Sequence, residues 1–193
     1  MSGRSAGLGL AEYEALLRAD FAGFAERAFV ELNPQTDFAT NWHFRVMAAK
    51  LAAVREGKIR RLVVNVPPRH LKSHLASVSF PAWCLGHNPS TQILCVSYAQ
   101  DLADKLSRDC RRIITSDWYQ RLFPARLAPR HQAVAEFETT QQGSRVATSV
   151  GGPPNCRRNS SASCRAGTPP TRRPSSAISA SAQPGGYRAR TFI

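Results

Sequence analysis

A lysine followed by a serine, Lys72-Ser73, is the pair of residues in this chain best suited to phosphate chemistry. A Lys ammonium and the backbone N–H groups of a helix start can hold phosphates, and a Ser hydroxyl can ligate Mg²⁺. We therefore predict a phosphate-binding loop that would hold a nucleoside triphosphate. Its residues are Pro67, Pro68, Arg69, His70, Leu71, Lys72 and Ser73, with Ser73 as the Mg²⁺ ligand.

The loop departs from the standard phosphate-binding pattern, G-x-x-x-x-G-K-[ST]. The two glycine positions of that pattern fall on Val66 and Leu71. The pattern alone therefore leaves a second interpretation open, in which Lys72-Ser73 is a surface pair at an ordinary helix start.

Two elements must flank the loop in order to position it. The apolar, β-branched run from Leu62 to Val66 predicts a buried strand, which the two prolines end because proline lacks an N–H donor. From Lys72 onward, apolar residues at 75, 78, 82 and 85 follow helical spacing. Pro81 lies inside this predicted helix, so we expect a kink or a restart there.

A second strand is predicted from Gln92 to Ser97, because its continuous apolar run is typical of a parallel sheet covered on both faces. Ser97 and Gln100 resemble a capping box at the start of the next helix. The charged face of that helix is either solvated or in contact with DNA or a neighbouring subunit. Its predicted buried residues are Leu102, Leu106, Cys110 and Ile113, and its charged face holds Asp101, Lys105, Arg108, Arg111 and Arg112.

The order strand, helix, strand, helix indicates a parallel α/β sheet. Two short strands, 133–137 and 145–150, are predicted to form a hairpin around Gln141-Gln142-Gly143. The predicted fold class is α/β, an incomplete P-loop NTPase-like parallel sheet with flanking helices and a disordered C-terminal tail. In this organisation residues 59–152 form a partial P-loop ATPase core.

Residues 1–58 are predicted to form a helical lead. Apolar residues recur at steps of three and four from Leu10 to Ala28, which indicates one helix that ends before Asn33-Pro34. A second helix is expected to begin at Asn41, as its N-cap, and to end near Gly57.

The formal net charge of +13 is unevenly distributed. Residues 153–193 contain seven Arg and no acidic residue, and they are poor in large apolar side chains. We expect this Arg/Ser/Pro-rich tail to be disordered, because it cannot bury enough surface to offset its chain entropy. The rest of the chain is moderately basic, which suits a phosphate-rich partner such as DNA but equally suits simple solubility.

The cysteines form no C-x-x-C pair. Cys84, Cys95 and Cys110 stand in apolar periodic segments and are interpreted as reduced core thiols, so a zinc site is not expected. No apolar run approaches the roughly 20 residues of a membrane span, and the start of the chain lacks the apolar stretch of a signal peptide. We therefore expect a cytoplasmic protein that has no membrane partner.

The segment Asn65 to Ser73 resembles the variant Walker A loop of phage terminase large subunits, the ATPases that package viral DNA. Further segments resemble that family in the same order, over roughly residues 40 to 152. They are Asn41-Trp42-His43, Phe80-Pro81-Ala82-Trp83, Asn88-Pro89-Ser90-Thr91, Ser97-Tyr98-Ala99, Ser116-Asp117-Trp118-Tyr119-Gln120 and Arg145-Val146-Ala147-Thr148-Ser149-Val150-Gly151-Gly152.

The resemblance implies ATP and Mg²⁺ as ligands, with Arg69 facing the triphosphate. It also implies that Trp42 and His43 lie near the nucleotide base, where a Trp face can stack and an imidazole can hydrogen-bond. Simple packing of these two residues is the alternative. For the full-length family it implies double-stranded DNA, a small terminase subunit and a portal protein as partners.

Hydrolysis in this family also needs an acidic Walker B strand, which holds Mg²⁺ and orients water. That strand should follow Gly152, yet the last Asp is Asp117 and the last Glu is Glu138. The carboxylate-rich nuclease domain of the family is missing as well. We therefore expect weak nucleotide binding at most and no meaningful turnover.

The abrupt change of composition at Pro153 suggests a frameshift, and we predict a one- or two-base insertion or deletion near codon 153. A native interaction tail is the rival explanation. Two functions from different classes thus remain: a truncated ATPase portion of a terminase, and a non-enzymatic basic protein that binds nucleic acid through the tail. Deleting residues 153–193 separates them, because only the second would lose all nucleic-acid binding.

Overall fold

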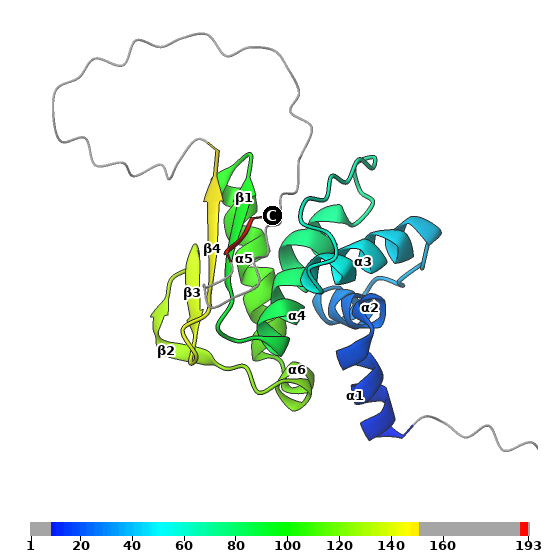
Figure 1. Cartoon of the computed structure of the whole chain (residues 1–193), viewed down its shortest axis with the longest axis horizontal. Helices are drawn as coiled ribbons and strands as arrows, with labels where there is room; N and C mark the ends of the chain where they lie inside the picture. Colours follow the sequence, from blue (N-terminus) through cyan, green and yellow to red (C-terminus); the bar gives the residue numbers. More distant parts are fainter. Residues whose placement is uncertain (1–8, 151–189, 193) are drawn as a thin grey trace, which may run out of the picture.

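A mixed β-sheet with helices packed beside it makes up the molecule (Figure 1). The computed structural model describes residues 9–150 and 190–192. The sheet has the strand order β2-β3-β4-β1-β5. Its strands are β1 (Gln92–Ser97), β2 (Leu127–Gln132), β3 (Glu136–Thr139), β4 (Ser144–Ser149) and β5 (Arg190–Phe192). The α/β class is therefore confirmed, with a mixed sheet.

Parallel pairing is confined to the middle and one side of the sheet. β1 runs parallel to β4, in a register that pairs Gln92 with Ser144 and Ser97 with Ser149. β5 also runs parallel to β1, whereas β3 pairs antiparallel with both of its neighbours, β2 and β4. The predicted parallel sheet is thus confirmed only for the pairing of β1 with β4 and β5, and the antiparallel strands β2 and β3 make the sheet a mixed one.

The predicted strand over Leu62 to Val66 is wrong. The structure describes an extended segment there, with an isolated bridge residue at Leu62 and no strand. Leu62, Val64 and Val66 pack against the core, whereas Val63 is 73 % exposed. The segment therefore buries its side chains on one side only. Its apolar residues suggested a strand, but apolar content does not determine whether a neighbouring strand is there to pair with it.

The predicted burial of β1 on both faces is also wrong in the described part of the chain. Ile93 and Cys95 are buried, whereas Val96, whose side chain points the opposite way to that of Cys95, is exposed. Helix α5 (Gln100–Thr115) packs against β1 and β4. Its predicted apolar face is confirmed for Leu106, Cys110 and Ile113, which are buried.

The helical lead contains a break that periodicity did not indicate. Instead of one helix, the structure has α1 (Leu10–Ala19) and α2 (Phe21–Leu32). Asp20 separates them, because its carboxylate accepts hydrogen bonds from the N–H groups of Ala22 and Gly23 and so caps α2. Leu10 and Tyr13, which were expected on the buried face, are exposed.

The predictions for the next helix are confirmed. Helix α3 (Trp42–Arg55) has Asn41 as its N-cap, although the Asn41 side chain makes no capping hydrogen bond. Gly57 has a φ of 76° and donates its N–H to the Val54 carbonyl, as a helix-ending glycine does. The capping box predicted at Ser97 and Gln100 is wrong, because Ala99 caps α5 and Gln100 bonds to Asp104 instead.

The helix that follows the candidate loop begins at Lys72, as predicted. Its irregularity lies one turn before Pro81 and is a π-helical segment, η1 (His74–Ser79), which continues into α4 (Phe80–His87). The π-turn lets the helix pass Pro81 without a break.

Aromatic side chains form the centre of the helical layer. Phe21 contacts Trp83 at 5.1 Å between ring centroids, and Phe24 contacts Phe123 at 6.0 Å. Tyr119, from the short helix α6 (Asp117–Leu122), is buried and donates its hydroxyl proton to the Ala82 carbonyl at 2.8 Å. The core therefore joins α2, α4 and α6.

The predicted hairpin is confirmed as β3 and β4. Gln142 turns the chain with a φ of 64°, and Gly143 lies so close to the Pro89 carbonyl oxygen that a Cβ would come within 2.1 Å of it. The Thr139 hydroxyl also donates to the Pro89 carbonyl. These contacts hold the hairpin against the loop that precedes β1.

The three cysteines of the described residues, Cys84, Cys95 and Cys110, are free, as predicted. Burial raises the pKa of the Cys110 thiol to about 12, so this thiol stays protonated and unreactive. The predicted disordered tail lies outside the described residues except for Arg190–Phe192, which form β5. Among the described residues, no helix combines the length and apolar character needed to cross a membrane.

Candidate functional site

Two residues of the candidate loop have positive φ angles although neither is glycine. The φ angles of Arg69 and Leu71 are 66° and 57°. Left-handed backbone is costly for residues with a Cβ, and it is uncommon for a bulky side chain such as leucine. Leu71 occupies the position of the second glycine in the phosphate-loop pattern, and its left-handed backbone is one that glycine adopts without steric cost.

The loop is fixed at both ends by hydrogen bonds. A ring nitrogen of His70, Nδ1, lies 2.9 Å from the Pro68 carbonyl oxygen, to which it donates when it carries the proton. The Leu71 carbonyl accepts from the Leu75 N–H at 2.9 Å, which is the first hydrogen bond of the helix. The helix therefore starts directly behind Leu71, and its positive dipole end faces the loop.

The charges at this helix start suit an anion. Arg69 is exposed and makes no ion pair with the residues that the structure describes. Lys72 and Ser73 are half-buried in the first helical turn, next to each other in sequence. Two cationic side chains, one hydroxyl and the helix dipole thus lie within five consecutive residues.

A cavity of about 290 Å³ lies beside the loop. Arg69, His70 and Leu71 form part of its wall, and His43 and Phe44 from the start of α3 form another part. The remaining lining residues are Phe29, Asp37, Phe38, Ala39 and Asn41. Of the predicted loop residues, Pro67, Pro68, Lys72 and Ser73 are not among those that line this cavity.

The structure brings His43 to the loop but leaves Trp42 outside the cavity wall. The His43 and His70 rings contact each other, with centroids 4.9 Å apart and an angle of 62° between the rings. Trp42 is 77 % exposed, and its ring stands against that of His43 at 6.1 Å. Of the two residues predicted near a base, only His43 lines the cavity.

Six lining residues of this cavity were not among the predicted site residues, namely Phe29, Asp37, Phe38, Ala39, Asn41 and Phe44. Phe38 contacts the rings of Phe29 at 5.2 Å and Phe44 at 5.0 Å. Asn41 was predicted only as a helix cap, yet its side chain makes no capping bond and instead lines the cavity. The segment between two helices carries no pattern that would have indicated this placement.

The residue after Ser73 anchors the helix to α2. His74 Nε2 lies 3.0 Å from the Ala25 carbonyl oxygen and 3.0 Å from the Ser79 hydroxyl oxygen. Because a carbonyl can only accept, Nε2 carries the proton. Burial lowers the pKa of His74, which favours this neutral form. The helix start is therefore held by a hydrogen bond to α2 as well as by the loop.

The described residues contain no group of three or more His, Cys, Asp or Glu side chains that could hold a metal ion. Mg²⁺ in nucleotide sites commonly uses one or two protein oxygens together with substrate phosphates. The Ser73 hydroxyl fits that role in part, because it lies in the first turn of the helix behind the loop. Asp37 is the one carboxylate among the residues that line the loop cavity, and Ser73 is not among them.

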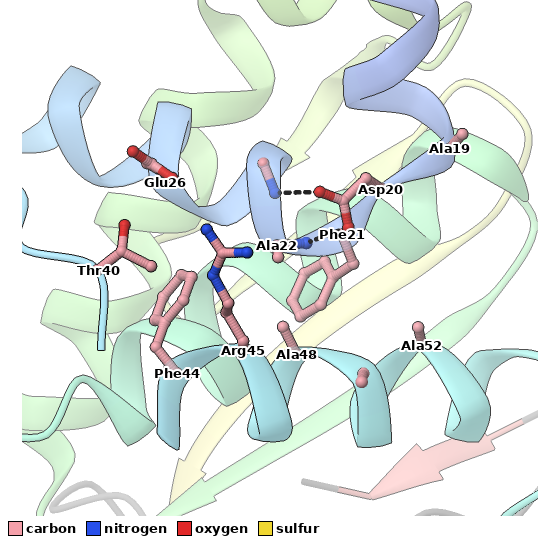
Figure 2. A pocket seen from close by; sticks show the side chains of 12 residues that line it. Ala19, Asp20, Phe21, Ala22, Glu26, Thr40, Phe44, Arg45, Ala48 and Ala52 are labelled. Carbon is pink, nitrogen blue, oxygen red and sulfur yellow. Dashed lines mark hydrogen bonds between the residues drawn. The ribbon is translucent and has the colours of Figure 1, made fainter. Parts of the chain in front are cut away.

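A second cavity, of about 340 Å³, lies between α2 and α3 (Figure 2). Its floor is made of alanines and of Phe21 and Phe44, and the Arg45 side chain rises into it from α3. Asp20 lines it but is engaged in capping α2. This cavity contains no residue of the candidate loop, and Phe44 alone is common to both cavities.

Comparisons of the chain with protein-family models, with curated proteins and with solved structures found no match. The function is therefore argued from the geometry of the loop and of the cavity beside it.

Proposed function

We propose that the chain is the nucleotide-binding portion of a terminase-type, DNA-packaging ATPase, and that residues 67–73 bind the phosphates of ATP. The observation that supports this most directly is the left-handed backbone of Leu71, with a φ of 57°, immediately before a helix that begins at Lys72. An ordinary helix start that carries a surface Lys-Ser pair does not require a left-handed residue before it.

The backbone of the loop is strained. A left-handed residue with a Cβ costs roughly 1–2 kcal/mol, and the loop contains two within three residues. Strain of this kind clusters at active sites, ligand clamps and switch regions, and successive N–H groups in alternating right- and left-handed backbone form anion-binding concavities. Alternating backbone hand over Arg69, His70 and Leu71 is consistent with such an anion-binding concavity.

Each side chain of the site has a role in this proposal. The Lys72 ammonium neutralises the outer phosphates, and the Arg69 guanidinium faces the triphosphate from the exposed side of the loop. The Ser73 hydroxyl holds Mg²⁺, which when bound supplies positive charge between the phosphates. The base enters the cavity lined by His43, and Trp42 covers it only if its exposed ring moves.

The proposal is limited to binding. Asp117 stands at the start of α6 and Glu138 lies within β3, so neither follows the carboxyl end of β1 or β4. Those ends, at Ser97 and Ser149, are where a parallel sheet presents groups to a ligand. Hydrolysis, and contacts with DNA, a small terminase subunit and a portal protein, belong to the longer proteins that the sequence resembles.

A second candidate function, nucleic-acid binding without enzymatic activity, is favoured by a feature of α5. Lys105, Arg108 and Arg112 are exposed on this helix, and they form no ion pair with the residues that the structure describes. Their spacing places them along one side of the helix, as a row of unpaired cations suited to phosphates.

The substitution Lys72→Ala tests the nucleotide site. We expect it to weaken binding of a fluorescent ATP analogue at least tenfold, because it removes the charge-assisted contact to phosphate, about 1.5–3 kcal/mol. Lys105→Ala, which removes an exposed cation from α5, is the matched control and should bind as the wild type does. Equal affinity of wild type and Lys72→Ala would leave nucleic-acid binding as the better function.

A further inference from the structure

The helix that carries Lys72 and Ser73 contains an unusual carbonyl group. In a regular α-helix the Ser77 carbonyl would accept a hydrogen bond from residue 81, but residue 81 is Pro81, which has no N–H. The helix instead widens into the π-turn η1, in which the Phe80 N–H reaches back five residues to the Leu75 carbonyl. The Ser77 carbonyl thus needs a donor from another part of the chain.

Arg145 of β4 supplies that donor. Its Nη2 donates to the Ser77 carbonyl at 2.9 Å. Arg145 is fully buried, with 0 % of its surface exposed, and it occupies the middle of the sheet, opposite Ile93 on one side and Phe137 on the other. It therefore links the centre of the sheet to the π-turn behind the candidate loop.

The burial of this guanidinium is costly. Nε and Nη1 of Arg145 have no hydrogen-bond partner among the described residues, and no described carboxylate forms an ion pair with it. The Phe137 ring, at 6.0 Å from the guanidinium carbon, is a weak substitute for a counter-ion. An apolar side chain of similar volume would fill the space without this cost, since buried charges are often no more stable than hydrophobic replacements.

The π-turn controls how the helix start is rotated. A π-turn contains one extra residue, and one residue of an α-helix corresponds to about 100° of rotation around the axis. If η1 became a regular α-helix, Lys72 and Ser73 would turn by about that angle relative to Phe80 and the residues after it. The directions of their side chains relative to α4 would therefore change by that angle.

We propose that Arg145 is a positioning residue, which holds the π-turn by its bond to Ser77 and so keeps Lys72 and Ser73 facing the phosphates. This inference rests on the proposed nucleotide site. Arg145 touches no part of the loop and acts through η1 alone.

Three variants test the inference. Arg145→Met keeps the length of the side chain and removes the donor, so it should weaken ATP-analogue binding about tenfold or more while the protein remains folded. Arg145→Lys keeps a donor and should retain most of the affinity. Pro81→Ala restores an N–H opposite Ser77 and favours the regular helix, so it should weaken binding without adding to the effect of Arg145→Met. Val146→Ala, on the opposite face of the same strand, is the control.

Amide hydrogen exchange separates this inference from the proposed function. In Arg145→Met we expect exchange over residues 72–80 to accelerate about tenfold, with β1 unchanged, whether or not nucleotide is present. A wild type that binds no nucleotide would refute the proposed function, and the exchange data would still decide the role of Arg145. If Arg145→Met binds and exchanges like the wild type, Arg145 does not hold the π-turn. If that variant does not fold, Arg145→Lys and Pro81→Ala decide in the same way.

Discussion

At the scale of single residues, the backbone of the candidate loop has a conformation that its residue types do not indicate. The sequence at positions 66 and 71 lacks both glycines of the phosphate-loop pattern. Leu71 nevertheless has left-handed backbone, which glycine adopts without steric cost, and Arg69 has it too. A search of the sequence for glycine at these two positions would therefore miss the loop. Other residues can adopt left-handed backbone there, at an energetic cost.

Arg69 allows the strain and the charge of the loop to be separated. Arg69→Ala removes the charge but keeps a Cβ at positive φ, whereas Arg69→Gly removes the charge and also relieves the strain. We expect both variants to lose the same ATP affinity and Arg69→Gly to be more stable than Arg69→Ala by about 1 kcal/mol in urea unfolding. Equal stability of the two would show that the left-handed backbone at this position is not strained.

Arg145 illustrates a different limit of sequence reasoning. The residue was predicted within a strand, and that is confirmed, but arginine is rarely buried without a partner. Its burial results from the meeting of β4 with a helix that is 68 residues away in the chain. No local pattern contains that information.

At the scale of elements, the reliable predictions came from segments whose pattern and termini agree. Helix α3, strand β1, helix α5 and the hairpin of β3 and β4 were all predicted within a few residues. The strand at 62–66 was wrong because a strand is defined by its partner, and the apolar run does not encode one. β2 was missed because Leu127–Gln132 contains a single large apolar residue and a proline, which only an edge strand accommodates.

Asp20 determines where the first two helices separate. Its carboxylate accepts from Gly23 at 2.9 Å and from Ala22 at 3.1 Å, so Asp20→Ala should destabilise the protein by about 1 kcal/mol. Urea unfolding measures the change. Asn41→Ala is the matched control, since Asn41 is an N-cap without a side-chain capping bond and should lose less than about 0.5 kcal/mol. A loss at Asn41 as large as that at Asp20 would contradict this account of capping.

At the scale of the whole molecule, the candidate site is assembled from distant segments. The cavity beside the loop takes its walls from α2, from the connection before α3, from the start of α3 and from residues 69–71. The sequence indicated the loop and His43, because these carry chemical groups in a recognisable order. It could not indicate Asp37 or Phe38, because their position depends on how α2 and α3 cross.

His74, which is partly buried, is expected to make the free energy of unfolding depend on pH. Burial lowers its pKa below the ordinary value of about 6.5, so at mildly acidic pH the unfolded chain binds more protons than the folded one. The contribution of neutral His74 is complete above about pH 6.5 and is lost as the pH falls toward the folded-state pKa. We expect the free energy of unfolding to decrease between pH 7.5 and 5.5 in urea titrations.

The control is His74→Gln, which cannot titrate and should flatten this pH dependence. His87 also favours its neutral form, because burial lowers its pKa. The nearby Arg55 charge lowers the His87 pKa further, by a smaller amount. It is more exposed than His74, so His87→Gln should flatten the profile less. An unchanged slope in His74→Gln would show that another group is responsible.

The two edges of the sheet differ in how readily a strand from another molecule could pair with them. At one rim, Pro129 interrupts the N–H row of β2, and proline on an edge strand is a known guard against strand addition. At the other rim, β5 pairs with Gln92–Leu94 and, within the described chain, leaves the outer edge of β1 from Cys95 to Ser97 without a strand partner. Strand addition is therefore expected at the β1 edge rather than at the β2 edge, and Val96→Pro, which removes a backbone N–H from this stretch, should reduce it.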